Sequence, residues 1–448
     1  MTAVLLLSTF WGCKKYVEID LSPNLYSSDN VFLESGTANS AIAALYSYYP
    51  TTYTLQNFTF LADISSDEMH YTGSTDEILQ FEQNTVGIEN SYVANYLWLY
   101  PYTVIRYANQ AIDGLTASTT LVDSVKNQLL GEAKFIRGWL YFNMANFFGK
   151  VPLVTTSEAL ENAEIGSSDS ATIYAQVVSD LVDAESKLST TYTGTSTYKI
   201  RANKWAAAAL LARVYLYQKN YASAITEASK VINSGTYTLA TPANAFIYSS
   251  SETILQFATT YGYSSFSTSY RTSSSTATVA PPTYVVDSAL ANSFDDGDLR
   301  KTTWIDSTTY NSTKYYRNYK YKLYSATAGN EYNVFLRLSE VYLIRAEAEL
   351  LSGDLSSAIT DINVIRSRAG LSNFTGSTTT AVLNEIIDQR NKELFGEFGQ
   401  RWFDLKRWGL ANSVLGTKKT TWTSTAVWMP IPYAQIILNP SLTQNDGY

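Results

Sequence analysis

The chain has little of the chemistry on which most enzyme sites depend. Its 448 residues include one cysteine, Cys13, and one histidine, His70. One cysteine excludes an internal disulfide, and one histidine excludes metal sites built from several imidazoles. A serine-histidine-aspartate triad would have to use His70, and no Gly-x-Ser-x-Gly turn accompanies it. We therefore expect a protein without metal, cofactor or catalysis, although 40 acidic residues leave a carboxylate-pair hydrolase open as an alternative.

Charge is also scarce, and aromatic residues take its place. Charged residues make up 16% of the chain, against a usual fraction of about 25%. The formal net charge is −8, so nucleic acid is not an expected partner, because phosphate binding needs a basic surface. Tyrosine is abundant instead, with 35 residues beside nine tryptophans. A tyrosine joins a flat apolar face to a hydroxyl, which suits both ligand contact at wet surfaces and half-buried packing.

No apolar run is long enough to cross a bilayer as a helix. The first residues do contain a short apolar stretch, 4–12, which ends in a small residue before Cys13. This stretch resembles a bacterial lipoprotein signal, in which cleavage leaves the cysteine thiol to be acylated. We expect residues 1–13 to be a signal with Cys13 as the lipidation site and the membrane anchor. A buried structural cysteine is the alternative.

Two long stretches have the apolar periodicity of amphipathic helices. One runs from about 92 to 115, and the other from about 123 to 148, where Gly149 and Pro152 end it. A shorter helical pattern occupies 36–49. The residues expected on the buried faces of the two long helices are Trp98, Tyr102, Ile105, Asn109 and Ile112 in the first, and Phe135, Trp139, Phe142 and Phe148 in the second.

Two helix pairs follow further along the chain. The first is predicted at 206–217 and 221–232, and the second at 334–351 and 355–368. Small residues at matching places allow the helices of a pair to approach closely, as in tetratricopeptide repeats. These residues are Ala212 and Ala224 in the first pair and Ala346 and Ala358 in the second. We therefore predict a mainly α-helical protein with a tetratricopeptide-like repeat frame.

Two segments lack this helical pattern. Residues 236–333 are rich in serine, threonine, tyrosine and glycine, and residues 50–90 have a similar character. Long irregular segments in compact proteins are usually functional or disordered, and their aromatic content argues against disorder. We predict that both segments form loops carried on the helical frame, with 236–333 as an inserted irregular, loop-rich lobe.

Four motifs in order along the chain resemble the SusD/RagB family of surface nutrient-binding lipoproteins. They include EAKFIRGWLYF, IRSRAG, GQRWFDLKRWG and LNPSLTQN. The motifs lie within 132–153, 338–370, 393–409 and 430–445. Each motif is weak alone, but all four in this order, with Cys13 near the start, make the resemblance specific. It spans nearly the whole chain.

The resemblance implies a fold and a function. Members of that family have a tetratricopeptide-like helical frame with an irregular second lobe. They lie on the outer face of the outer membrane, where they bind oligosaccharides or in some cases peptides, are not catalytic, and cover a SusC-like TonB-dependent transporter. On this basis we divide the chain after the signal into an N-terminal SusD-like region at 14–235, the loop-rich insertion at 236–333 as part of the ligand face, and a C-terminal SusD/RagB region at 334–448.

Candidate ligand residues come from the two segments that lack helical periodicity. A sugar presents an apolar face of C–H groups to aromatic rings and hydroxyls to polar side chains, so a binding surface should mix the two kinds. One cluster has this mixture near His70, and the other lies near Tyr261, Tyr263 and Tyr310. From these clusters we expect ligand contacts from Asp67, Tyr71, Tyr270, Arg271 and Trp304. For each of them ordinary loop packing is the alternative.

Several charged residues invite other interpretations. Arg401 and Asp404 have the spacing to pair on one helix face, so we expect them to be structural. A glycoside hydrolase would need two facing carboxylates, such as Asp67 with one of Asp295, Asp296 or Asp298, and the sequence gives no reason to place them together. A peptide-binding repeat scaffold would expose polar groove residues, whereas the inner helix positions here are largely apolar or aromatic.

Overall fold

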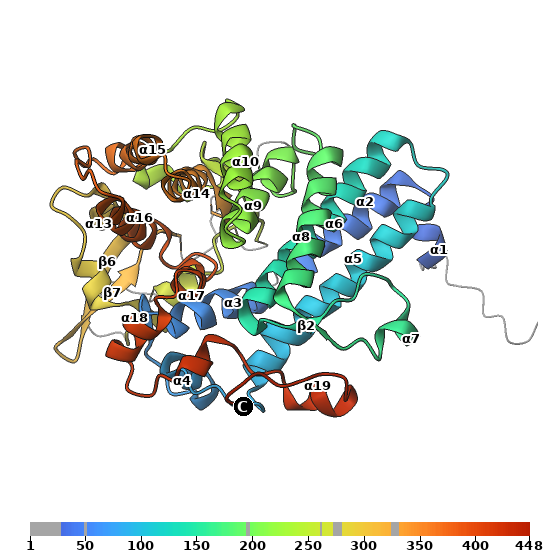
Figure 1. The fold of residues 1–448 in the computed structure, drawn as a ribbon, viewed down its shortest axis with the longest axis horizontal. Helices are drawn as coiled ribbons and strands as arrows, with labels where there is room; N and C mark the ends of the chain where they lie inside the picture. The colour runs from blue at the N-terminus through green and yellow to red at the C-terminus, as the bar shows by residue number, and fades with distance from the viewer. Residues whose placement is uncertain (1–27, 49–51, 194–197, 260–261, 272–279, 324–330) are drawn as a thin grey trace, which may run out of the picture.

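The computed structural model describes residues 28–48, 52–193, 198–259, 262–271, 280–323 and 331–448. Cys13 and Tyr261 lie outside these residues, so the lipid anchor stays a prediction. Within the described ranges α-helices predominate and strands are short (Figure 1). The predicted mainly helical class is confirmed, and none of the described helices is long and apolar enough to cross a membrane.

The N-terminal half is a group of packed helices on the right of Figure 1. They are α2 (Ser35–Tyr48), α5 (Tyr100–Ala117), α6 (Asp123–Phe148) and α8 (Ser170–Lys187), whereas α3 (Thr52–Ser65) lies near the middle of the view. Helix α6 has the predicted bounds and is buried on almost every side, which explains its weakly amphipathic sequence. Gly131 and Gly138 face α8 so closely that a Cβ at Gly131 would lie 2.8 Å from Cγ of Leu188.

The predicted helix pairs are present in the middle and on the upper left of Figure 1. They are α9 (Lys204–Tyr217) with α10 (Tyr221–Asn233), and α14 (Leu338–Leu351) with α15 (Leu355–Arg368), which α16 (Thr379–Leu394) extends. The second helix of each pair begins with a side-chain cap, in which Asn220 accepts from the Ser223 N–H and Asp354 from the Ser357 N–H. Each cap satisfies backbone N–H groups at the start of the second helix, only a few residues after the first helix ends.

Two predictions about local structure are wrong, one about where a helix begins and one about the character of a whole segment. Residues 334–337 belong to strand β8 (Asn333–Arg337), which pairs antiparallel with β4 (Thr253–Phe257), and the helix begins only at Leu338. The segment 50–90 is not a set of loops, because it contains α3, β1 (Met69–Tyr71) and α4 (Asp76–Gln83). Helix α3 is buried over most of its surface, so it shows no amphipathic stripe that periodicity could detect.

A four-stranded antiparallel sheet joins the two segments that lack helical periodicity. Its strand order is β1-β5-β7-β6, with β5 at Tyr284–Val286, β6 at Ile305–Tyr310 and β7 at Thr313–Asn318. Strand β1 comes from residues 50–90 and the other three from 236–333, so segments more than 200 residues apart in sequence share one sheet. Strands β6 and β7 lie at the lower left of Figure 1, below α13 and α16.

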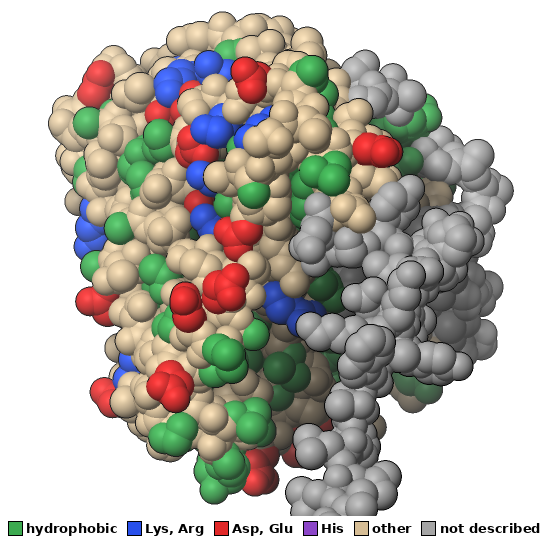
Figure 2. All heavy atoms as spheres, turned by 90° about the vertical axis from the view of Figure 1, so that its right-hand side faces the viewer, with side chains coloured by type: hydrophobic (Ala, Val, Ile, Leu, Met, Phe, Trp, Pro, Cys, Tyr) green, Lys and Arg blue, Asp and Glu red, His purple; other side chains and the backbone are tan. Residues whose placement is uncertain are grey.

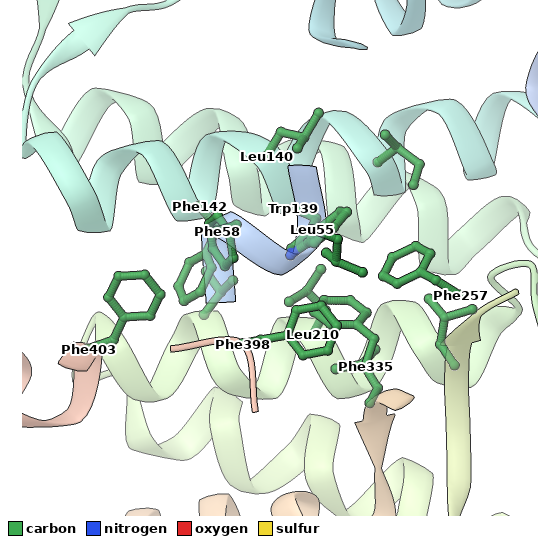
Figure 3. Close-up of a cluster of buried hydrophobic side chains, with 14 of the residues drawn as sticks. Leu55, Phe58, Trp139, Leu140, Phe142, Leu210, Phe257, Phe335, Phe398 and Phe403 are labelled. Carbon is green, nitrogen blue, oxygen red and sulfur yellow. The ribbon is translucent and has the colours of Figure 1, made fainter. Parts of the chain in front are cut away.

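An aromatic core connects the helices to the sheet region. Figure 3 shows Trp139 of α6 directed toward Phe335 of β8 and Phe257 of β4. The Trp139 ring centroid lies 4.7 Å from that of Phe335 and 5.2 Å from that of Phe257. Trp139 belongs to the predicted inner face of α6. The residue that this face places in the core therefore also holds strands β4 and β8 against the helix.

Shorter elements complete the chain. The helices are α1 (Ser28–Val31), the π-helix η2 (Val93–Leu99), α7 (Ala159–Asn162), η4 (Pro242–Asn244), α11 (Ser267–Tyr270), α12 (Ser288–Asn292), α13 (Leu299–Trp304), α17 (Gln400–Arg407), α18 (Ala411–Lys418), η5 (Ser424–Val427) and α19 (Tyr433–Leu438), and the strands are β2 (Val151–Pro152) and β3 (Ser167–Ser168). Figure 2 shows the end that carries α1, α5 and α7, where acidic and apolar side chains are scattered over the lower part.

The charged residues of the motifs are structural, but their pairing differs from the prediction. Arg401 does not pair with Asp404. Its Nε donates to Asp67 at 2.7 Å, while Asp404 accepts from Arg390 at 2.7 Å and from Arg407 at 2.7 Å. Helix α17 is therefore joined to α16 and to the α3-β1 turn by ion pairs that connect distant segments, which helical spacing alone does not predict.

Candidate functional site

The sheet places two tyrosines from distant segments side by side. Tyr71 of β1 is the register partner of Tyr284 of β5, and the two ring centroids lie 5.4 Å apart. Tyr284 in turn stacks on Phe60 at 4.4 Å, which fixes it against the core, while Tyr71 stays half-buried. The Tyr71 ring folds back over Gly73, where a Cβ would lie 2.3 Å from the Tyr71 hydroxyl oxygen. Only glycine leaves room for this ring position.

Three more tyrosines continue this aromatic surface. Tyr92 precedes the π-helix η2, Tyr96 lies within it, and Tyr100 begins α5. The ring centroids of Tyr92 and Tyr96 are 5.4 Å apart, and those of Tyr96 and Tyr100 are 5.8 Å apart with an interplanar angle of 14°. All three are half-buried, so one part of each ring is accessible. We term Tyr71, Tyr92, Tyr96 and Tyr100 the tyrosine strip.

The parts of the tyrosine strip lie close enough to interact electrostatically. The pKa of Tyr92 is raised by burial first, and then by its neighbours Tyr96, Tyr71 and Glu77. Tyr71 and Tyr92 are thus near each other although they come from different elements. Because π-helical turns occur frequently at functional sites, the η2 segment is a candidate for part of a ligand surface.

Polar groups position the strip. Asn90 Oδ1 accepts from the backbone N–H groups of Tyr92 at 3.0 Å and of Val93 at 3.2 Å, which starts the helical turn that carries the rings. Glu77 accepts from the Ser91 N–H at 2.6 Å and from the Ser91 hydroxyl at 2.9 Å. The edge of the strip therefore presents the Glu77 carboxylate and the Ser91 hydroxyl beside aromatic faces, while the Asn90 amide is buried beneath it.

A cavity of about 510 Å³ lies next to the strip, over the sheet. Tyr71 lines it together with Tyr310 and Lys314 of the β6-β7 hairpin, and its other lining residues include His70, Tyr315 and Tyr316. His70 lies between two carboxylates, and its ring nitrogens donate to Glu82 at 2.9 Å and to Asp287 at 2.8 Å. These hydrogen bonds, to Asp287 first and then to Glu82, raise the pKa of His70 to about 9, so it is charged at neutral pH. We term this space the sheet cavity.

The residues predicted from sequence fall into three groups. Tyr71 belongs to the tyrosine strip and lines the sheet cavity. Asp67 is bound by Arg401 at 2.7 Å and Lys418 at 3.2 Å. Burial alone would raise the Asp67 pKa, but these two cations lower it. Arg271 donates to the carbonyl of Lys322 and lies 4.7 Å over the Tyr319 ring, so its guanidinium is held by the segment that follows β7.

Tyr270 and Trp304 lie in the interior. Their exposed fractions are 1% and 0%, so a ligand at the molecular surface does not reach them in this structure. The Tyr270 hydroxyl donates to Asp63 at 3.1 Å, and the indole N–H of Trp304 donates to the carbonyl of Pro242 at 2.7 Å. Both rings are thus used to pack loop segments against the frame, and we do not include them in the proposed ligand surface.

Three of the four carboxylates considered for a hydrolase are paired with cations, and the fourth, Asp296, is exposed. Asp298 caps α13 and pairs with the buried Arg300 at 2.7 Å, while Asp295 is 3.5 Å from Lys392. Asp67 is held by Arg401. Among the described residues no group of three or more histidine, cysteine or carboxylate side chains is arranged to hold a metal ion.

A second tyrosine group lies elsewhere on the described surface. Tyr198, Tyr248 and Tyr332 are half-buried, with ring centroids 5.6 to 6.3 Å apart. Each of its three rings contacts the other two, so the rings form a triangle rather than a row. A flat sugar chain fits a row of rings better than a triangle, so this group ranks below the tyrosine strip.

Sequence analysis did not identify three of the four strip residues. Tyr92, Tyr96 and Tyr100 fall within the helix predicted from about 92 to 115, but they are among neither its expected buried residues nor the expected ligand contacts. Their spacing of four was a usable signal, because residues four apart lie on one helix face and three tyrosines in such a row are unusual on a buried face. The proximity of this row to Tyr71 depends on tertiary structure, and no local pattern reveals it.

Comparisons with known proteins agree with this architecture. A family model described as "SusD family" matches residues 169–448, and a model described as "Starch-binding associating with outer membrane" matches residues 24–216. A SusD-like protein of Formosa agariphila is 24% identical, over 99% of this chain and 97% of the relative.

Solved structures show the same fold. A SusD superfamily protein from Bacteroides vulgatus has a TM-score of 0.81 at 22% identity, covering 93% of this chain and 100% of that chain. Surface glycan-binding protein A from Bacteroides fluxus has a TM-score of 0.78 at 21% identity, covering 93% and 100% respectively. Because the "SusD family" model spans more than half of the residues, the chain belongs to the SusD family.

Proposed function

We propose that the protein captures oligosaccharides at the cell surface by stacking them on the tyrosine strip. The observation that carries this proposal is the row of half-buried rings formed by Tyr92, Tyr96 and Tyr100, with the half-buried Tyr71 near Tyr92. Each ring offers an apolar face to the C–H groups of a sugar, and the hydroxyls and Glu77 offer partners to sugar hydroxyls. The sheet cavity extends this surface and gives room for a branch or a chain end.

The binding should be of modest affinity. Sugars on an open strip stay partly hydrated, so only part of their apolar surface is removed from water, at about 25 cal/mol per Å². Several rings in a row favour ligands of several sugar units over monosaccharides, because each further unit adds a contact without a new cost of association. The proposed function is therefore capture of oligosaccharides, with no bond broken in the ligand.

The relatives support a glycan ligand. One matching family model is described as starch-binding, and the neighbouring Bacteroides fluxus structure is described as a surface glycan-binding protein. The alternative within the same family is a peptide ligand, which the aromatic rings alone do not exclude. A glycoside hydrolase is less favoured, because its suggested carboxylates are held by Arg300 and Arg401.

We further propose an outer-membrane location and a transport partner. The lipid on Cys13 would anchor the chain with its ligand surface facing the exterior, and a SusC-like TonB-dependent transporter would receive the glycan. A binding protein held beside a transporter raises the local concentration of ligand at the transporter, which compensates for modest affinity. Palmitate labelling of the protein in its native host tests the anchor. We expect labelling that Cys13→Ala abolishes, and unchanged labelling would contradict the anchor.

A glycan array combined with a peptide array tests the ligand class. We expect the purified chain to bind one or a few oligosaccharide families and no peptides, and to leave labelled glycans intact after prolonged incubation. Binding to peptides with no binding to glycans would contradict the carbohydrate ligand, and release of shorter glycans would contradict the non-catalytic role.

A further inference from the structure

A small cavity at the C-terminal side of the helical frame is lined by hydrogen-bond donors. It has a volume of about 250 Å³ and lies between α6, α8, α9, α17 and the segment that follows η5. Its lining includes Lys406 and Arg407 of α17, the hydroxyl-bearing side chains Tyr174 and Tyr217, and Trp428. The rim residues Gly409 and Asn412 are exposed, so the cavity opens to solvent. We term it the lysine cavity.

Lys406 brings an uncompensated charge to this cavity. Within the part of the chain that the structure describes, no carboxylate forms an ion pair with its ammonium, and its one hydrogen bond goes to the carbonyl of Asn146. The Nζ atom lies 4.0 Å over the ring of Trp428 and 5.4 Å over that of Trp402. These aromatic faces attract the cation but do not neutralise it. Burial accordingly lowers the pKa of Lys406 well below its ordinary value.

The neighbouring cation differs in this respect. Arg407 donates to Asp404 at 2.7 Å and to Glu347 at 2.7 Å, so its charge is already balanced. The lysine cavity therefore holds one cation with acidic partners and one without. A charge that is withdrawn from water without a counter-ion is costly, and an anion in the cavity would remove that cost.

Two tyrosine hydroxyls add further donors. The hydroxyl of Tyr217 is buried and has no hydrogen-bond partner. The Tyr174 hydroxyl accepts from the Asn146 side chain at 2.9 Å, which leaves its own proton to be donated. Buried polar groups are normally satisfied, so donors that converge on a cavity indicate an acceptor that belongs there.

We propose that the lysine cavity binds a small organic carboxylate, with the Lys406 ammonium as its counter-ion and the tyrosine hydroxyls as further donors. A volume of about 250 Å³ exceeds the roughly 30 Å³ that one water occupies, so an anion with a short carbon chain fits. Trp428 and Val427 provide apolar wall for that chain. An inorganic anion would use the ammonium but leave the apolar wall without a partner.

Acetate is a direct probe of this site. The melting temperature of the full chain is measured at pH 7 and constant ionic strength while sodium acetate replaces sodium chloride. A ligand that binds only the folded state raises the melting temperature and saturates. We expect a saturable rise of a few degrees with acetate, together with a change in tryptophan fluorescence, because Trp428 lies beside the ammonium.

Three variants make the test specific. Lys406→Met keeps the length of the side chain and removes its charge, and we expect it to abolish the acetate effect. Lys219→Met makes the same change at an exposed lysine and is expected to keep it. Tyr217→Phe removes one donor and is expected to weaken acetate binding about 3- to 10-fold, as for the loss of one hydrogen bond. This last variant also serves if Lys406→Met does not fold.

The result that overturns the proposal is equally definite. If acetate and chloride give the same melting temperature in the unchanged protein, the cavity holds water or any anion, and the carboxylate site is refuted. A rise with acetate that Lys406→Met or Tyr217→Phe leaves unchanged would place the binding elsewhere and also refute it. None of these outcomes depends on glycan binding by the tyrosine strip.

Discussion

At the scale of single residues, Asp63 and Glu68 form a buried carboxyl pair beside strand β1. Their exposed fractions are 0% and 1%. Asp63 accepts from the Tyr270 hydroxyl at 3.1 Å, and Glu68 accepts from the Gly396 N–H at 3.3 Å. Burial raises the pKa of Asp63 to about 7, and burial and the Asp63 charge raise that of Glu68. The folded protein thus keeps protons that an unfolded chain releases near pH 4.

This pair predicts a pH dependence of stability. Because the folded-state pKa of Asp63 is raised to about 7, the stability that this acid contributes is fully present below about pH 4 and is lost as pH rises through about 7; the raised pKa of Glu68 acts in the same direction. Asp63→Asn keeps a neutral side chain of similar shape, so we expect a shallower decline, by up to about 1.4 kcal/mol per pH unit. Urea unfolding between pH 4.5 and 7.5 measures it, and equal slopes in both proteins would contradict it.

The accessibility of single residues was the hardest feature to predict from sequence. Trp304 looked like a sugar-stacking residue in an irregular segment, but Lys320, Arg337 and Arg368 lie 4.9 to 5.8 Å from its ring and enclose it. Those cations come from later parts of the chain, so no local sequence pattern predicts that the Trp304 ring is buried. Tyr71 stays accessible because its strand lies at the edge of the sheet.

At the scale of elements, prediction succeeded where local signals end a helix. Helix α6 stops at Gly149, which has a positive φ of 74°, and α15 starts at the cap residue Asp354. Prediction failed where an element is buried all round, as in α3, and where β8 joins α14 without a break, because Val334, Phe335 and Leu336 continue the apolar pattern of the helix. Strand pairing with β4 decides that boundary, and it is a long-range contact.

Replacement of glycine by alanine should have opposite effects at a closely packed site between α6 and α8 and at an open site in α2. In Gly131→Ala the new Cβ would lie 2.8 Å from Leu188 Cγ and 3.3 Å from the Ala184 carbonyl oxygen, which should cost about 1–3 kcal/mol. In Gly36→Ala of helix α2 the Cβ meets nothing within 4 Å, and we expect a gain of about 0.5–1 kcal/mol. Thermal unfolding compares the two; no loss in Gly131→Ala would contradict the close packing between α6 and α8, and a loss in Gly36→Ala would contradict the open space at that site.

At the scale of the whole molecule, the proposed ligand surface is built from separate parts of the chain, which the helical frame holds together. Sequence predicted two irregular segments that carry binding residues, and the sheet does join them through β1 and β5. It did not predict that the helix around Tyr96 would supply most of the aromatic row. Family motifs explain this difference, because their residues, such as Trp402 and Asp404, lie in the buried frame.

The tyrosine strip is the central claim of this account, and calorimetric titration of an oligosaccharide identified on the glycan array tests it most directly. Tyr96→Ala removes the middle ring of the row, and we expect affinity to fall at least 10-fold, on the order of 1.4 kcal/mol or more. Tyr248→Ala removes a ring of the second tyrosine group and is expected to leave affinity within about 2-fold. Unchanged affinity in Tyr96→Ala, with a loss in Tyr248→Ala, would contradict the strip and place the ligand on the second group.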